Sequence, residues 1–423
     1  MTSIRRRGVL AAAIAAPALV GCGTAQARII VLGGGFAGTS AARALKASNP
    51  RLDVTLVEPS NRYFSGPNSN LVVAGALDID KLSFGYDDLQ RRGINVLHES
   101  VLRIDHAPRT VLTTGGITVP YDRMIVCPGI DFRINEIEGY ASITPLGMPR
   151  AWKAATQTDL LRRRLETMED GGVVAVFVPD MPYRCATAPY ERASLIAHWL
   201  QRTKPRSKVI VVDAKASFPG QDLFADAWRQ LYGPSIEWVG GPQYRVTKVD
   251  LQTRTVTTAG GARFTAAVAN VIPPQTAGAI AIAAGLTDDS AWCPVDPVTF
   301  ESLLQKNVHV IGDSADLAPV PKTAFTAAIQ GRLAAQAVVD LLALRPPIEP
   351  AIANTYYSLL APDYGISLTD LFRVRGGRYA AIPAASATSP RAADAETRKR
   401  EADYAAGWFA SITMDTWGQQ AGH

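Results

Sequence analysis

Three cysteines in the body of the chain are the residue type best suited to redox chemistry. Cys127 ends an apolar stretch, whereas Cys185 and Cys293 each lie in a proline-flanked loop. The latter two are 108 residues apart, so no local Cys-x-x-Cys motif joins them. In an oxidising compartment an apposed pair would form a disulfide, either purely structural or redox-active. We favour a redox role for Cys185 and Cys293, and a buried core thiol for Cys127.

A glycine pattern near the start of the chain indicates where a redox cofactor would bind. The spacing Gly-x-Gly-x-x-Gly follows the apolar run 29–32 and precedes a stretch, 39–46, that predicts a helix. Such glycines allow a tight turn, backbone approach to a pyrophosphate and close helix–strand packing, while the helix N-terminus offers free N–H groups. The residues expected to form this dinucleotide site are Gly33, Gly35, Phe36, Ala37 and Gly38.

Two acidic residues far apart in the sequence distinguish the class of dinucleotide. Glu58 ends the next predicted strand, 20 residues after Gly38, which suits a ribose 2′-hydroxyl and not a 2′-phosphate. Asp313 follows Gly312 at the end of another predicted strand, where flavin-binding folds hold a ribitol. An NAD-only site has no such second acid, so the two together predict FAD.

Two further segments are expected to contact this cofactor. A predicted strand that ends at Pro128 and Gly129 is typical of the first cofactor domain in two-dinucleotide flavoproteins. Lys322 precedes a long predicted helix, 323–344, and with the helix dipole would stabilise negative charge on a reduced flavin. The alternative for Lys322 is a solvated surface lysine.

A second α/β unit follows, and its turn lacks the glycine fingerprint. Predicted strands at 173–178 and 208–213 flank a predicted helix at 190–202. The turn from Pro179 to Pro189 contains three prolines, several bulky side chains and no glycine. Because these residues block the backbone approach that a second pyrophosphate needs, we expect this unit to bind no NAD(P)H.

These patterns predict an α/β fold with two Rossmann-like dinucleotide-binding domains and a small C-terminal α+β domain, and the order of the units resembles that of glutathione-reductase-like proteins. The expected segments are a signal peptide at 1–27, an FAD-binding domain at 28–143 and 271–345, an NAD-like domain at 144–270 and a C-terminal interface domain at 346–423.

Composition and charge exclude several classes of partner. The 423 residues are 47% hydrophobic and 19% charged, which is ordinary for a globular protein of two or three domains. Removing Arg5, Arg6 and Arg7 with a signal peptide leaves 40 of the 43 basic residues against 38 acidic ones, so no nucleic-acid partner is expected. Five scattered histidines predict no metal site, and beyond the leader no apolar segment predicts a transmembrane helix.

The leader predicts export to the periplasm. Arg6-Arg7-Gly8-Val9-Leu10 resembles a twin-arginine motif and precedes a short apolar region. Two ends of the leader are open: Ala25-Gln26-Ala27 has the form of a cleavage site, whereas Leu19-Val20-Gly21-Cys22 resembles a lipoprotein box with a lipid anchor at Cys22. We favour cleavage after Ala27, because the mature chain would then begin at the first strand.

Several motifs together resemble one family along essentially the whole chain. They are Cys185 with Glu191 six residues later, Trp292-Cys293-Pro294-Val295-Asp296, His309-Val310-Ile311-Gly312-Asp313 and Tyr357-Ser358-Leu359-Leu360-Ala361-Pro362. The chain is similar to the flavoprotein subunit of flavocytochrome c sulfide dehydrogenase, a family related to sulfide:quinone oxidoreductases.

This resemblance implies a periplasmic enzyme that oxidises sulfide to zero-valent sulfur or polysulfide and passes electrons to a c-type cytochrome subunit. It implies a redox disulfide between Cys185 and Cys293, with Glu191 as the acid/base residue. Gly66 stands where the family's FAD-attaching cysteine is expected, so we expect FAD to be non-covalent. The alternatives are a sulfide:quinone oxidoreductase-like enzyme and a non-catalytic flavin-binding partner protein.

Overall fold

Short runs of branched apolar residues form two parallel sheets, as expected for strands buried on both faces. A computed structural model describes residues 26–140 and 144–419, so the predicted leader motif and Cys22 lie outside the described residues. The first sheet has the strand order β20-β9-β1-β2-β5, and all of its neighbours are parallel. Its strands are β1 (Arg28–Leu32), β2 (Asp53–Val57), β5 (Asn95–Leu97), β9 (Arg123–Val126) and β20 (Val308–Val310).

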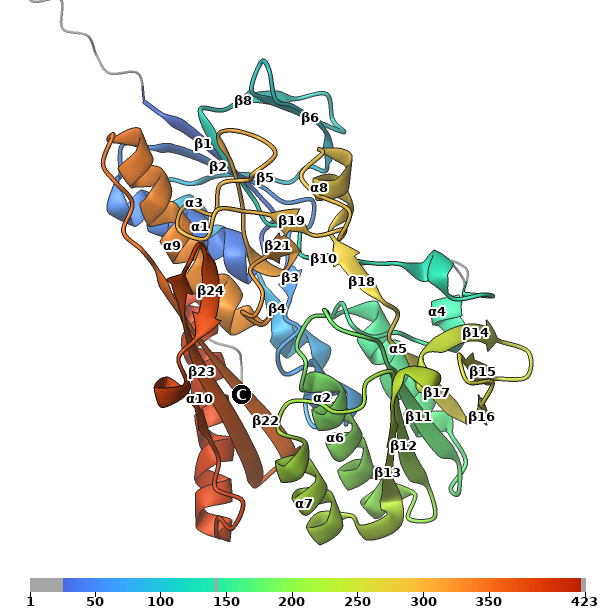
Figure 1. Cartoon of the computed structure of the whole chain (residues 1–423). Coiled ribbons are helices and arrows are strands. Elements are labelled where there is room, and N and C mark those ends of the chain that lie inside the picture. Colours follow the sequence, from blue (N-terminus) through green and yellow to red (C-terminus); the bar gives the residue numbers. More distant parts are fainter. Residues whose placement is uncertain (1–25, 141–143, 420–423) are drawn as a thin grey trace, which may run out of the picture.

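Two long helices pack against each other beside this sheet (Figure 1). Helix α1 (Phe36–Ser48) follows the glycine turn, and α9 (Ala324–Leu342) follows β20. Thr323 caps α9, since its side chain accepts the Thr326 N–H at 3.1 Å. The helices approach closely at Gly331, where an added Cβ would lie 2.4 Å from the Ala37 carbonyl oxygen.

Smaller elements complete the first unit and link it to the second. Antiparallel pairing joins β10 to β18, which connect the two units, while β19 pairs with β21 in parallel. The remaining bounds are β3 (Tyr63–Phe64), α2 (Ser69–Val73), β4 (Ser83–Phe84), α3 (Asp87–Arg91), β6 (Val101–Asp105), β7 (Thr110–Thr113), β8 (Thr118–Pro120), β10 (Ile130–Phe132), β18 (Gln275–Ala277), α8 (Ala279–Ala283), β19 (Cys293–Pro294) and β21 (Ala315–Asp316).

The second unit repeats the plan with a four-stranded parallel sheet of order β13-β12-β11-β17. Helix α6 packs against β12 of this sheet, and against α2 of the first unit. The bounds are α4 (Thr144–Gly147), α5 (Thr156–Thr167), β11 (Val173–Val178), α6 (Ala188–Thr203), β12 (Lys208–Asp213), α7 (Gln221–Leu231), β13 (Ile236–Gly240), β14 (Val246–Asp250), β15 (Thr255–Thr258), β16 (Arg263–Thr265) and β17 (Val268–Val271).

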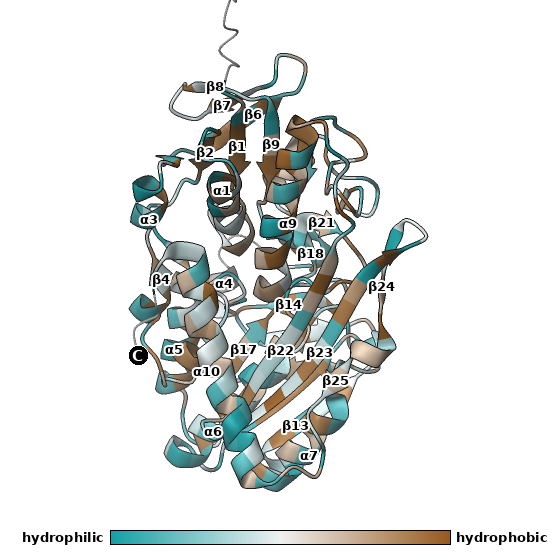
Figure 2. Ribbon diagram, turned by 90° about the vertical axis from the view of Figure 1, so that its left-hand side faces the viewer, coloured by the Kyte–Doolittle hydropathy of each residue, from teal (hydrophilic) through white to brown (hydrophobic). Residues whose placement is uncertain are grey.

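The C-terminal part is a long antiparallel hairpin covered by a helix (Figure 2). Buried and part-exposed residues alternate along β22, so that one face of the strand packs inward. Trp417, at the end of the helix, is fully buried and stacks on Tyr63 and Phe84 of the first unit. The bounds are β22 (Ala351–Ala361), β23 (Tyr364–Arg375), β24 (Arg378–Ala381), β25 (Ala387–Thr388) and α10 (Ala395–Trp417).

This arrangement confirms the predicted fold class of two Rossmann-like units and a small C-terminal α+β part. Among the described helices, none combines the length and the apolar character that crossing a bilayer requires.

Candidate functional site

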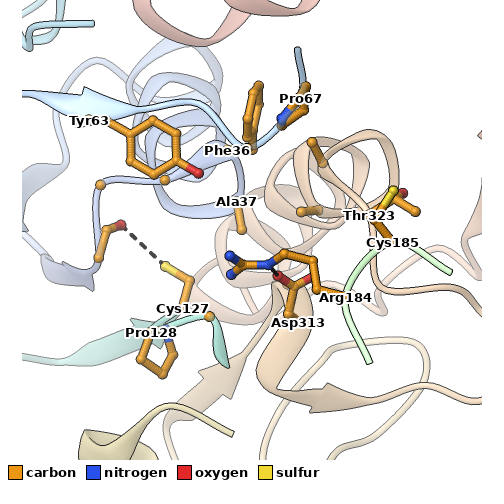
Figure 3. A pocket seen from close by; sticks show the side chains of 18 of the residues that line it. Phe36, Ala37, Tyr63, Pro67, Cys127, Pro128, Arg184, Cys185, Asp313 and Thr323 are labelled. Atoms are coloured by element: carbon orange, nitrogen blue, oxygen red, sulfur yellow. Dashed lines mark hydrogen bonds and ion pairs between the residues drawn. The ribbon is translucent and has the colours of Figure 1, made fainter. Parts of the chain in front are cut away.

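A cavity of about 450 Å³ lies where the three parts of the chain meet, at the carboxyl ends of the first sheet's strands (Figure 3). This is the edge at which open α/β sheets bind their ligands. Most of the residues predicted for the site line this cavity: Gly33, Gly35, Phe36, Ala37, Glu58, Pro128, Gly129, Cys185, Glu191, Gly312 and Asp313.

The glycine turn is shaped by close backbone approaches. Gly33 has φ +101°, and an added Cβ there would lie 2.4 Å from the Cys127 carbonyl oxygen. An added Cβ at Gly38 would lie 1.9 Å from the Gly33 carbonyl oxygen, so Gly38 permits helix packing and is not among the residues that line the cavity. The turn therefore leaves the N-terminus of α1 open to the cavity, as a pyrophosphate requires.

Glu58 is fixed at the end of β2 by main-chain donors. Its Oε2 accepts the Gly34 N–H at 2.8 Å, and its Oε1 accepts the Ser60 N–H at 3.0 Å. The carboxylate thus lies against the glycine turn, where an adenosine ribose would be held. Together the open turn and this acid fit the dinucleotide part of FAD.

Asp313 faces the same cavity and is paired with a residue that the sequence did not single out. Its Oδ2 lies 2.6 Å from Nε of Arg184. The Arg184 N–H donates to Oε1 of Gln275 at 2.9 Å, which fixes the loop from the second unit over the first. Arg184 immediately precedes Cys185, and this adjacency was the one available signal for it. The guanidinium is a cation within the cavity wall.

Cys185 lies in the loop between β11 and α6 with φ +55°. Its N–H donates to the Lys322 carbonyl oxygen at 2.8 Å, which ties the loop to the start of α9. Burial, and then the negative charge of Glu191, raise the pKa of the Cys185 thiol to about 12. The side chain is part-exposed and faces the cavity.

Cys293 is not among the described residues that line the cavity. It lies in β19, pairs with Ala315 of β21, and is 0% exposed. Cys127 does line the cavity, but its Sγ donates to the Leu32 carbonyl oxygen at 3.0 Å beneath the glycine turn. All three cysteines are free thiols, so the disulfide between Cys185 and Cys293 stays a prediction.

Lys322 is not among the described residues that line the cavity, and its predicted contact with a flavin stays a prediction. Its Nζ donates to the carbonyl oxygens of Asp313 and Ala315, both at 2.8 Å, and lies 3.9 Å from the centre of the Trp292 ring. Burial lowers its pKa to about 8. It is neither a residue of the described cavity wall nor a solvated surface lysine.

Glu191 is held by Asn70, which the sequence patterns did not single out, and by Leu359, which lies in the motif at 357–362 named above. Its Oε2 accepts from Nδ2 of Asn70 at 2.7 Å, and its Oε1 accepts the Leu359 N–H at 2.9 Å. Burial raises the pKa of this carboxyl. The C-terminal part contributes Thr355, Tyr356, Tyr357 and Trp408 to the wall.

In the second unit, the acidic residue that corresponds to Glu58 is buried and hydrogen-bonded within the protein. Asp213 ends β12, the place that Glu58 has in the first unit. It accepts from the Tyr190 hydroxyl at 2.6 Å and from Nζ of Lys215 at 2.5 Å, and it is 0% exposed. The Tyr190 ring stacks on Phe218 with centroids 3.5 Å apart. This carboxylate is already bonded within the protein.

Gly66 lines the cavity, and an added Cβ there would meet no atom within 4 Å among the described residues. The position has room for a side chain.

Comparisons with known proteins agree with this geometry. Residues 158–273 match the family model described as the central part of the sulfide dehydrogenase [flavocytochrome c] flavoprotein chain. Residues 348–417 match the flavin-binding model of flavocytochrome c sulphide dehydrogenase, and residues 27–169 match the pyridine nucleotide-disulphide oxidoreductase model.

Three individual proteins illustrate the likeness. The flavoprotein chain of sulfide dehydrogenase from Chlorobaculum thiosulfatiphilum is 47% identical over 45 residues, which are 11% of this chain and 94% of that sequence. The mitochondrial sulfide:quinone oxidoreductase of Mus musculus is 24% identical over 331 residues, 76% of this chain and 72% of that protein. The solved sulfide:quinone oxidoreductase of Aquifex aeolicus shares the fold, with a TM-score of 0.71, 15% identity and 93% of each chain covered. The chain therefore belongs to the family of flavocytochrome c sulfide dehydrogenase flavoprotein chains, which is related to the sulfide:quinone oxidoreductases.

Proposed function

We propose that this protein is a periplasmic flavoenzyme that oxidises sulfide to zero-valent sulfur or polysulfide and passes the electrons to a c-type cytochrome subunit. One observation carries the proposal: the Cys185 thiol lines the same cavity as the dinucleotide cradle formed by Gly33, Gly35 and Glu58. Family membership supports sulfide as the substrate, because related proteins carry sulfide oxidation in their names.

FAD would be held by the glycine turn, by Glu58 and by Asp313, and when bound it supplies a two-electron acceptor. We propose that it is bound without a covalent link, because Gly66 offers no side chain for one. Arg184, a cation in the cavity wall, favours negative charge in the cavity.

Cys185 is proposed to form a sulfur–sulfur bond with sulfide, giving a persulfide, and the two electrons lost by the two sulfurs would pass to bound FAD. Cys185 is the described cysteine that faces the cavity without a hydrogen bond from its sulfur to the glycine turn. Glu191 is proposed to exchange a proton with the substrate. Its raised pKa brings proton uptake and release closer to neutral pH, which suits a general acid/base residue.

A second candidate differs in the electron acceptor. Similarity to sulfide:quinone oxidoreductase over 76% of the chain favours a quinone as that acceptor. We do not expect NAD(P)H to serve as electron donor or its oxidised form as acceptor, because Asp213 is bonded to Tyr190 and Lys215. In addition, the turn after the first strand of the second unit contains no glycine.

The test is an anaerobic titration of the FAD-loaded protein with sulfide, followed by the flavin absorbance. Bleaching by sulfide with reoxidation by a c-type cytochrome supports the proposal. Reoxidation by a short-chain quinone alone supports the second candidate. A flavin that sulfide leaves oxidised, or that NADH reduces instead, contradicts the proposed function.

A further inference from the structure

Asn70 connects the site residue Glu191 to a buried arginine. Asn70 lies on α2 of the first unit, whereas Glu191 and Arg192 are adjacent on α6 of the second. Nε of Arg192 donates to Oδ1 of Asn70 at 2.9 Å, and Nδ2 of Asn70 donates to Oε2 of Glu191 at 2.7 Å. Within the described part of the chain, the Asn70 amide thus hydrogen-bonds both charged side chains to the first unit.

The arginine determines which way the amide faces. Guanidinium nitrogen atoms only donate, so the oxygen of Asn70 must face Arg192 and its NH₂ group must face Glu191. The two amide hydrogens are both used, since Nδ2 also donates to the Ala188 carbonyl oxygen at 3.1 Å. Arg192 is itself fixed, being 2% exposed and bonded to Asn270 and to the Ala151 carbonyl oxygen.

The carboxyl of Glu191 consequently receives a donor on each oxygen, from Asn70 and from the Leu359 N–H. Donors to a carboxylate favour its ionised form, and this opposes the burial that favours the protonated form. Three parts of the chain meet at this one group: α2, α6 and β22. Its orientation toward the cavity therefore depends on a side chain outside its own helix.

We propose that Asn70 is a positioning residue that holds the Glu191 carboxyl in the cavity wall near Cys185 and favours its ionised form. The inference depends on the proposed function only for the role of Glu191 in proton exchange. The hydrogen-bond network itself makes a prediction that needs no sulfide.

That prediction concerns the reactivity of Cys185. When Glu191 ionises, its negative charge disfavours the nearby thiolate. A plot of the logarithm of the Cys185 alkylation rate against pH should therefore rise steadily except near the pH at which Glu191 loses its proton. This departure from the steady rise is called the break in the profile. The other charged or titratable groups near Glu191 and Cys185 are Arg184, Arg192, Asp313, Tyr183 and Tyr356.

The experiment measures this rate with iodoacetamide in the FAD-loaded protein from pH 5 to pH 10, with peptide mass spectrometry to separate Cys185 from Cys127 and Cys293. Asn70→Asp keeps the shape, still pairs with Arg192 and replaces the donor to Glu191 by an acceptor. We expect the break in the profile to move up by about one to two pH units. Asn270→Asp is the matched control, because Asn270 contacts Arg192 but has no described contact with Glu191, and it should leave the break in place.

A double variant guards against a merely structural effect. In Asn70→Asp/Glu191→Gln the new amide can donate to the new carboxylate, so the contact re-forms with its roles exchanged. We expect it to recover thermal stability relative to Asn70→Asp, and we expect Glu191→Gln alone, which leaves no carboxyl at either position, to show no break. An unmoved break in Asn70→Asp, an equal shift in Asn270→Asp, or no recovery in the double variant would overturn the proposal. Failure of sulfide to reduce the flavin would leave all three results interpretable, so the two proposals fail separately.

Discussion

Replacing Cys185 and Cys293 one at a time separates two accounts of the redox chemistry. In the first, which the family resemblance implies, sulfide opens a Cys185–Cys293 disulfide; in the second, which the described positions of the two sulfurs favour, Cys185 reacts without Cys293. The structure places Cys185 in the cavity wall and Cys293 in β19, fully buried and outside the described wall. We expect Cys185→Ala to slow flavin reduction by sulfide by a factor on the order of 10³ or more, as the loss of a covalent nucleophile does. We expect Cys293→Ala to leave this rate within about threefold.

The cost of Cys293→Ala should appear in stability instead. The side chain is part of the main apolar cluster, so removing one buried sulfur atom should lower the free energy of unfolding by about 1–2 kcal/mol. Alanine suits this test because the hydroxyl of serine would add an unpaired buried polar group, at about 1–3 kcal/mol.

The assay is anaerobic stopped-flow reduction of the flavin by sulfide, with FAD content and a chemical unfolding curve measured on the same preparations. Equal loss of reduction in both variants, with FAD retained, would refute the reasoning. It would instead favour the redox disulfide between Cys185 and Cys293 that the family resemblance implied.

Three further predictions concern stability. Burial lowers the Lys322 pKa from 10.5 to about 8, so the folded protein is destabilised below pH 8 and gains stability as pH rises toward 10.5. The unfolding free energy of the wild type, measured relative to Lys322→Met, should therefore rise by about 2–3 kcal/mol between pH 7.5 and 10. Parallel curves of unfolding free energy against pH for the two proteins would contradict this. Gly331→Ala should lower the free energy of unfolding by about 1–3 kcal/mol, because its Cβ would meet the Ala37 carbonyl oxygen. Gly407→Ala, in open space on α10, should raise it by about 0.5–1 kcal/mol. Urea unfolding measures both variants, and equal effects would argue against close packing of α1 and α9. Trp417→Ala should lower the free energy of unfolding by about 3–5 kcal/mol and release FAD. Thermal unfolding measures the stability, and the flavin fluorescence of a filtrate measures the released FAD. A variant that is as stable as the wild type and fully loaded with FAD would count against the aromatic contact.

Features encoded locally were predictable from the sequence. The strands at 173–178 and 208–213 have the predicted bounds, because an apolar run between turn residues determines a buried parallel strand. The glycine turn was also predictable, since its spacing reflects backbone approaches within a few residues and one neighbouring strand. The positions of Glu58 and Asp313 followed from the ends of their strands.

Contacts between distant segments were not predictable in this way. Asn70 and Glu191 are 121 residues apart, and Glu191 and Leu359 are 168 apart. Lys322 was expected to contact the cofactor because it precedes a helix, and its hydrogen bonds to the carbonyl oxygens of Asp313 and Ala315 were not foreseen. Side-chain direction in a loop depends on which carbonyl groups the tertiary fold leaves unpaired, and a single sequence does not contain that information.

The contact between Trp417 and Phe36 has a consequence for biosynthesis. Phe36 begins the helix that follows the glycine turn, and its ring packs edge-on against Trp417 with centroids 4.8 Å apart. The ribosome makes the glycine turn and Glu58 early, but Trp417, which packs on Phe36 from outside the described cavity wall, is made some 380 residues after Phe36. The Phe36 side of the cavity therefore gains this aromatic support only after nearly the whole polypeptide has been made.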